Sequence, residues 1–439
     1  MRMWSRAGTV TVAIAVVAAV AGCQDNGGAN SNSKVLTYWA SQQSPSVERD
    51  KEILKPELRK FTERTGIRVN LEVIPFTDLL NRILTATTSG KGPDVINLGN
   101  SWAPSLQATG ALVEWDDAMM AKIGGAKRFT PVSLQTGGAE GETPTSVPLY
   151  SKVYQLYYNK KLFEQAGITK PPATWKDFVT TAKKLTKDTD GDGRSDQWGL
   201  GVRGQASTIA VHYAYILGSA RGAEFFDGDK PTFESPAAVD GIEQYLSWMG
   251  KDKIVNPSDA ENADWADVYE AFAEDRIGMM LVQTLGQTLK DYRLTDKDYG
   301  VAPVPANTGP DSKNVGSFLG GTNAAILKST GNLDGATELI KFLTSAQEQV
   351  TLNAAYGTIP PVTDAKGTAF ETEEAKIARQ TMATRAIPLP RVPQETQFET
   401  LVGNAVVNWL SDTATGKQPG AEQISSELED ASAKVSAGG

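Results

Sequence analysis

The sequence predicts an α/β protein with more than one domain, and three observations support this. The chain has 439 residues, which is more than one ordinary domain needs. Residues 35–98 alternate between short apolar runs and longer segments with helical periodicity, in the order βαβαβ, which predicts a parallel sheet with helices on its faces. Apolar residues make up 40% and charged residues 22% of the chain, as in ordinary globular proteins.

The amino-terminal segment predicts export and lipid anchoring. Two arginines precede a mostly apolar run over residues 10–20, which is shorter than the roughly 20 residues that cross a membrane. We therefore expect residues 1–22 to be a signal peptide and residues 23–34 to be a flexible tether. The run ends in V-A-G-C, which resembles a lipobox and implies palmitate and further acyl chains on Cys23; an ordinary secretory signal is the alternative.

Charge and the scarcity of Cys and His exclude several classes of partner and chemistry. A net charge of −9 repels polyanions, so nucleic acid is not an expected partner. One histidine, His212, and one cysteine exclude an intramolecular disulfide and a zinc site built from several Cys and His. The same counts argue against Ser-His-Asp and Cys-His catalysis.

Local signals place the first elements of the chain. Strands are expected at 35–39, 67–74 and 95–98. A helix is expected over 47–65 with a break at Pro56, and Thr77 is expected to cap a second helix. The loops 41–44 and 99–102 follow the carboxyl ends of two strands, where open α/β sheets bind ligands.

Later signals continue the pattern. Residues 149–158 are rich in β-formers and tyrosines and predict one strand, after which Asn159 caps a short helix that stops at Gly167. A further strand is expected at 197–202, and another ends at 282–284. Helices are expected at 174–185, 206–217, 333–343, 345–354, 373–383, 396–410 and 421–435, with two more starting at Ser235 and Asp264.

The stretch from Pro148 to Gly167 resembles the crossover segment of bacterial extracellular solute-binding proteins of the sugar ABC-importer class, the maltose-binding-protein-like family. Its residues 156–163 fit the form L-x-Y-N-K-x-L-F. Motifs of the same family follow in the same order: F-x-x-G-x-x-A-M at 272–281 with Asp275 at the usual glycine, a second crossover at 299–305, G-G-x-x-x-x-I at 320–326, and a third crossing at 356–361. The resemblance covers nearly all of residues 35–435.

This resemblance implies a two-lobe periplasmic-binding-protein fold with three interlobe crossings and a ligand cleft between the lobes. The first lobe is expected to comprise residues 35–147 and 304–356, and the second lobe residues 148–303 and 357–439. Lobes joined in this way can close about a ligand by hinge motion.

The resemblance also indicates which residues face the ligand. A sugar presents hydroxyl groups around an apolar ring face, which amides, hydroxyls and flat aromatic rings can recognise. The candidate ligand-binding residues are Gln42, Gln43, Asn100, Ser101, Trp102, Tyr150, Lys152, His212, Trp265, Gln283, Gly320, Gly321, Tyr356 and Arg391. Trp102 and Trp265 are the preferred stacking rings, Trp39 is a further candidate, and packing in the core is the alternative for the tryptophans and for His212.

An acidic turn follows the helix expected at 174–185. Asp188, Asp190, Asp192 and Asp196 occupy positions 1, 3, 5 and 9 of a D-x-D-x-D-G pattern, a spacing at which oxygen ligands can wrap one Ca²⁺. Position 12 is Gly199, where an EF-hand has a bidentate Glu, so we expect a weak structural Ca²⁺ site; a solvated turn is the alternative.

The resemblance implies the substrate-binding subunit of an ABC transporter: a lipid-anchored monomer on the extracytoplasmic side that captures a sugar or oligosaccharide, delivers it to the permease by closing, and performs no catalysis. A subunit that binds glycerol phosphate or a glycerophosphodiester is the alternative if Lys152 and Arg391 both line the cleft. A glycoside hydrolase would need two carboxylates about 5–9 Å apart, and the expected cleft loops supply no such pair. The repeats or long apolar patch of an adhesin are absent from the sequence.

Overall fold

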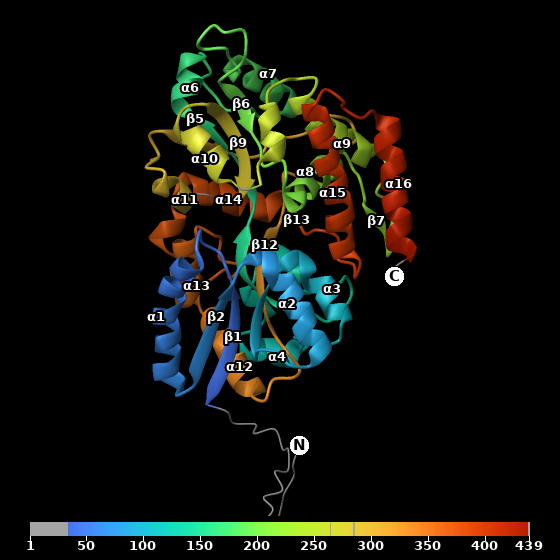
Figure 1. Cartoon of the computed structure of the whole chain (residues 1–439). Helices are drawn as coiled ribbons and strands as arrows, with labels where there is room; N and C mark the ends of the chain where they lie inside the picture. The colour runs from blue at the N-terminus through green and yellow to red at the C-terminus, as the bar shows by residue number, and fades with distance from the viewer. Residues whose placement is uncertain (1–33, 264, 284–285, 438–439) are drawn as a thin grey trace, which may run out of the picture.

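The computed structural model describes residues 34–437 except 264, 284 and 285, and it has the expected two-lobe α/β architecture (Figure 1). Each lobe is built on one sheet. The sheet of the first lobe has the order β2-β1-β3-β12-β4. Its strands are β1 (Val35–Ser41), β2 (Arg68–Ile74), β3 (Val95–Gly99), β4 (Val147–Lys152) and β12 (Gly320–Ile326). The βαβαβ order makes β1, β2 and β3 parallel, whereas β12 runs antiparallel between β3 and β4.

Helices cover both faces of this sheet. They are α1 (Val47–Thr65), α2 (Phe76–Ser89), α3 (Ala103–Ala108), α4 (Asp117–Lys122), α5 (Pro131–Leu134), α12 (Leu333–Leu343) and α13 (Ala346–Tyr356). The expected break at Pro56 is wrong, because α1 is continuous through it. The carbonyl that loses its partner there belongs to Glu52, which is exposed and so can bond to water. Thr77 is not a cap either, since α2 already begins at Phe76.

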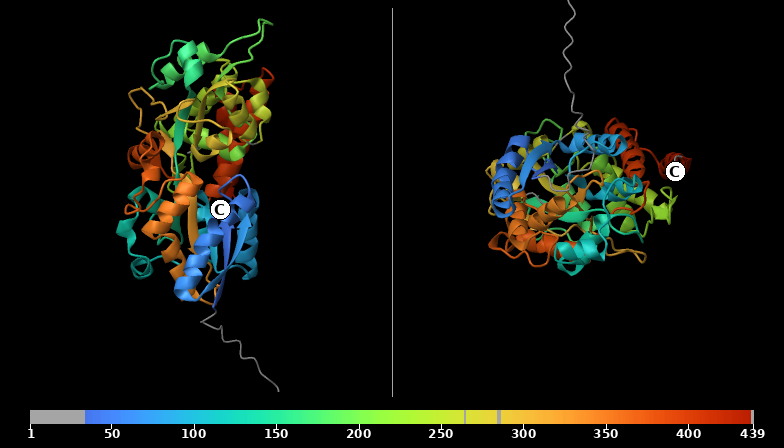
Figure 2. Two further views of the ribbon diagram at one scale, coloured as in Figure 1. Left: turned by 90° about the vertical axis from the view of Figure 1, so that its left-hand side faces the viewer. Right: turned by 90° about the horizontal axis from the view of Figure 1, so that it is seen from below.

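The sheet of the second lobe has the order β10-β5-β9-β6. Its strands are β5 (Tyr154–Asn159), β6 (Trp198–Gly201), β9 (Ile277–Gln283) and β10 (Tyr299–Ala302). Its helices are α6 (Lys160–Gln165), α7 (Trp175–Leu185), α8 (Ser207–Ser219), α9 (Pro236–Met249), α10 (Ala266–Ala273), α11 (Gly286–Asp291), α14 (Glu373–Thr384), α15 (Glu395–Ala414) and α16 (Ala421–Ala437). Buried α8 packs between α9 and α15 at the centre of this lobe. Figure 2 shows the two lobes stacked along the long axis of the molecule.

The single strand expected at 149–158 is in fact two strands that belong to different sheets. The strand is interrupted at Val153, which is fully buried. Before this residue, β4 belongs to the first sheet, and after it, β5 belongs to the second sheet. The expected boundary between residues 147 and 148 therefore falls at the start of β4, and the first sheet extends to Lys152. Two short strands, β11 (Ser317–Phe318) and β13 (Ala386–Ile387), pair beside the crossings. Among the described residues, no helix is long and apolar enough to cross a membrane.

Candidate functional site

A short central segment, Ser317–Thr322, connects β11 to β12 and contacts both lobes. From the first lobe, the Asn100 side-chain amide donates to the Leu319 carbonyl at 2.9 Å, and the Gln43 side-chain amide donates to the Thr322 hydroxyl at 3.0 Å. We call this segment, together with the residues that contact it from the two lobes, the interlobe seam. Asn100 and Gln43 come from the loops that follow β3 and β1, so the carboxyl ends of these parallel strands meet at the seam, as expected.

The second lobe contacts the same segment. The Tyr154 amide donates to the Ser317 hydroxyl at 2.8 Å, and the His212 ring lies 4.1 Å from the Phe318 ring, between centroids. His212 is buried and its Nδ1 lies 3.0 Å from the Tyr154 hydroxyl. Burial lowers the pKa of His212 to about 3, so the ring is neutral at pH 7. The packed polar role, which was the alternative at this position, describes it well.

Two glycines in the seam make close contacts that a Cβ would disturb. A Cβ at Gly320 would lie 2.4 Å from Nε2 of Gln283, and a Cβ at Gly321 would lie 2.0 Å from the Tyr150 carbonyl oxygen. Gly321 also has φ of 150°, where side chains are strained. Lys152 stands opposite Gly320 in the pairing of β4 with β12. It is half-buried, and burial lowers its pKa.

The two lobes are in direct contact at one edge of the seam, which we call its front edge. Arg391 forms an ion pair of 2.7 Å with Glu140 of the first lobe, and the Ser105 hydroxyl donates to the Pro393 carbonyl at 2.7 Å. Between these contacts remains a hollow of about 10 Å³, lined in part by Asn100, Ser101 and Arg391. This edge of the seam is therefore closed in this structure, and the hollow that remains is too small for a sugar.

Two buried carboxylates at the seam were missed by the sequence analysis. Glu395 and Glu399 lie one turn apart at the start of α15, and neither side chain is more than a tenth exposed. Burial raises the pKa of Glu399 to about 7 and that of Glu395 well above its usual value. Ser101 and Trp102 of the first lobe lie close enough to Glu399 to oppose this rise in its pKa. Two acids at positions i and i+4 on the apolar face of a helix were the signal that could have found them.

Several expected contacts lie elsewhere. Trp102 is buried in the first lobe, with its ring 4.6 Å from that of Phe76, so it offers no free stacking face here. Trp265 is half-buried and stacks on Tyr269 at 5.7 Å between ring centroids. Trp39 is half-buried and lies beneath Arg82.

Three further candidates serve the interior of the first lobe or its loops. Tyr150 and Tyr356 pack edge to face in the first lobe, 5.2 Å apart. The Gln42 side chain turns back to donate to the Ser44 carbonyl. None of these three side chains forms a described contact across to the second lobe in the closed form.

A larger cavity of about 800 Å³ lies behind the crossings, between β10 and α14. Its lining includes Tyr158, Tyr299, Phe370 and Arg379, and none of the candidate residues from the sequence lines it. Buried side-chain atoms without a hydrogen-bond partner occur in both lobes, and we place the candidate site at the seam because several of them lie in it or beside it. Those atoms are Gln43 Oε1, Gln283 Nε2, Gln394 Oε1 and both carboxylate oxygens of Glu395.

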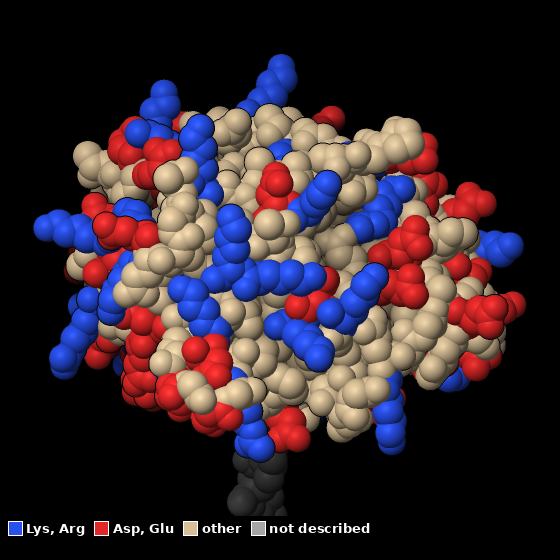
Figure 3. Space-filling view, turned by 90° about the horizontal axis from the view of Figure 1, so that it is seen from above, with Lys and Arg blue, Asp and Glu red and all other residues tan. Residues whose placement is uncertain are grey.

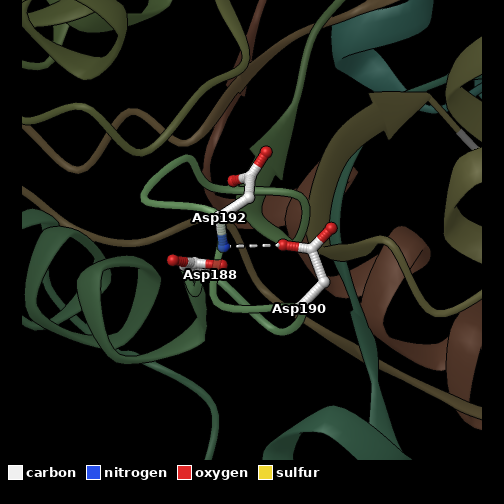
Figure 4. Close-up of side chains that lie close together, drawn as sticks. All are labelled: Asp188, Asp190 and Asp192. Carbon is white, nitrogen blue, oxygen red and sulfur yellow. Dashed lines mark hydrogen bonds between the residues drawn. The ribbon is translucent and has the colours of Figure 1, made fainter.

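The acidic loop lies apart from the seam. Asp188, Asp190 and Asp192 have carboxylate oxygens within 4.8 Å of one another (Figure 4). Asp196 is not in this group, because its carboxylate accepts from the backbone and hydroxyl of Thr189. The Asp188 carboxylate accepts backbone N–H bonds from Gly191 and Gly193, which hold its pKa below the usual value. Seen from above, the outer end of the second lobe carries acidic and basic side chains side by side (Figure 3).

Comparisons with known proteins agree with this fold. The family model for bacterial extracellular solute-binding proteins matches residues 44–350. A Brucella abortus protein described as a binding protein is 30% identical over 284 residues, which are 64% of this chain and 65% of that protein. This match thus spans somewhat less than two thirds of the relative. The diacetylchitobiose binding protein DasA of Streptomyces coelicolor is 24% identical over 94% of both chains.

Solved structures show the same fold. The ABC transporter solute binding protein of Thermotoga lettingae, bound with α-D-tagatose, superposes with a TM-score of 0.75 at 23% identity, covering 92% of this chain and all of its own.

Proposed function

Since the chain belongs to the bacterial extracellular solute-binding protein family, we propose that it captures a sugar or oligosaccharide outside the membrane and delivers it to an ABC permease. The relative that aligns over 94% of both chains is named for a disaccharide derivative, and the structural neighbour is bound to a sugar. Both support a saccharide ligand. In this proposal the protein is a monomer on the extracytoplasmic side, anchored through lipid on Cys23, which lies outside the described residues.

The observation that carries this proposal is the group of unpartnered polar atoms at the seam. Buried polar groups in proteins nearly always have a hydrogen-bond partner. Here amides and carboxylates from both lobes lack one: Gln43, Gln283, Gln394 and Glu395. A ligand rich in hydroxyl groups supplies donors and acceptors to all of them, and the closing lobes then exclude water from it.

Binding without turnover is the expected behaviour. A glycoside hydrolase places its two carboxyl groups at least about 5 Å apart, on either side of the scissile bond. Glu395 and Glu399 instead lie side by side, one turn apart on the same helix, rather than on either side of a bond. The glycerol-phosphate alternative gains no support, since Glu140 neutralises Arg391 and only Lys152 remains of its two cations.

A saccharide panel tests the proposed function. The chain from residue 24 onward should be stabilised by one group of saccharides, by about 2.7 kcal/mol at a hundred times Kd, in thermal-shift and calorimetric titrations. Asn100→Ala should weaken that binding about tenfold, because it removes a hydrogen-bonding amide at the seam. Asn81→Ala, at an exposed position of α2, is the control and should bind like the parent. No response to any saccharide, or turnover of a glycoside, would contradict the proposal.

We also propose that the acidic loop binds Ca²⁺ weakly and serves stability only. Three carboxylates within 4.8 Å support this. Addition of Ca²⁺ at ten times its Kd should raise the free energy of unfolding by about 1.4 kcal/mol, and Asp190→Asn should abolish the response. Mg²⁺ at equal concentration is the control. If millimolar Ca²⁺ did not change the melting temperature, the loop would be a solvated turn.

A further inference from the structure

We propose that the saccharide bound at the seam carries a basic nitrogen, which Glu395 and Glu399 hold as an ammonium group. This inference rests on the proposed function and narrows its ligand to amino sugars. It starts from two carboxyl groups that lie side by side, buried, on the first turns of α15.

The described residues supply no cation to this pair. Arg391 is engaged by Glu140 at 2.7 Å. His212 of α8 approaches Glu399 at 3.9 Å, but burial keeps its ring neutral. The remaining neighbours are uncharged at neutral pH: Tyr215 of α8, and Ser101 and Trp102 of the first lobe.

The pair is also placed where a ligand can reach it. Ser101 and Trp102 of the first lobe lie close enough to Glu399 to lower its pKa, and Ser105 of the first lobe hydrogen-bonds to Pro393 and Thr396 beside it. These contacts join the two lobes, so opening breaks them and exposes the carboxylates on the wall of the opened seam. Neither carboxylate oxygen of Glu395 has a hydrogen-bond partner in the closed form.

We expect an ammonium group because the buried carboxyl pair lacks a countercharge when the lobes are closed around a ligand. A buried carboxylate without a countercharge is costly, and two adjacent ones cannot both ionise. A neutral sugar leaves the pair with a shared proton or an uncompensated charge. An ammonium group supplies the missing countercharge, because it donates a charge-assisted hydrogen bond to the ionised member of the pair while the other member keeps its proton. Such a bond is about twice as strong as one between neutral groups.

Matched saccharides test the inference by calorimetric titration at pH 7. Each pair differs only in an amine against a hydroxyl or amide: glucosamine with glucose, galactosamine with galactose, and chitobiose with both cellobiose and N,N′-diacetylchitobiose. At least one amino member should bind ten or more times tighter than its neutral partners. The preference should shrink towards pH 5, because protonation of the carboxylates removes the partner of the ammonium group.

Variants assign the preference to the pair. Glu395→Gln and Glu399→Gln should each remove most of the amine preference, so that an amino saccharide binds no tighter than its neutral partners. Glu422→Gln, an exposed acid in the first turn of α16, is the control and should keep the preference. Neutral sugars that bind as tightly as the amines, or an amine preference that survives in both variants, would overturn the inference while the proposed function stands. If no neutral or amino saccharide bound, that result would instead count against the proposed function.

Discussion

Glu399→Gln is expected to make the protein more stable above pH 7, by up to about 3 kcal/mol, and to make that gain vanish below pH 4.5. Burial raises the pKa of Glu399 from 4.5 in the unfolded chain to about 7. Between these values the folded state binds more protons than the unfolded state, so the stability that Glu399 contributes falls as pH rises. Glutamine keeps the shape of the side chain and removes this titration.

Unfolding by urea at several pH values measures the effect as a difference between variant and parent. The difference is the useful quantity, because other groups titrate in the same range. Burial also raises the pKa of Asp259 to about 7, and the lowered pKa of His212 acts with the opposite sign between about pH 3 and 6.5. Glu422→Gln serves as the exposed control. A gain that does not change with pH would mean that Glu399 is not protonated on folding.

Elements defined by local signals could be predicted closely. Helix α1 has the expected bounds, because Ser46 accepts from the amide of Arg49 at its start and Gly66 adopts a left-handed conformation at its end. The break between β4 and β5 could not be predicted in this way, since residues 149–158 have strand formers on both sides of it. What separates the two strands is the membership of each half in a different sheet, which depends on partners far along the chain.

The candidate site also contains both residues that local signals predict and residues that only the tertiary packing brings there. Gln43, Asn100 and the glycines of the seam follow from strand ends and from close approach of the backbone. Glu395 and Glu399 did not, because only the packing of α15 against α8 and the first lobe buries them. Trp102 is a mixed case: a ring at the end of a strand suggests a stacking surface, whereas in this structure helix α2 brings Phe76 against it.

Gly321→Ala is expected to destabilise the protein strongly, by about 3 kcal/mol, whether or not a ligand is present. At φ of 150° any side chain is strained, and its Cβ would lie 2.0 Å from the carbonyl oxygen of Tyr150. That oxygen belongs to the backbone of β4, so it cannot move without disturbing the pairing of β4 with β12. Thermal and urea unfolding measure the loss. Gly331→Ala is the control, because its Cβ meets nothing within 4 Å.

The neighbouring Gly320→Ala should separate binding from stability. Its Cβ would meet Nε2 of Gln283 at 2.4 Å and the edge of the Phe318 ring at 3.0 Å. Both are side-chain atoms, and Nε2 of Gln283 is the end of a flexible side chain and has no hydrogen-bond partner to lose. We therefore expect less than about 1 kcal/mol of destabilisation, but a clear loss of ligand affinity, because the displaced amide no longer faces the seam. If Gly320→Ala binds like the parent, then Gln283 does not contact the ligand. If both glycine variants lose stability equally, the seam is a rigid structural element, and its two glycines have no separate roles.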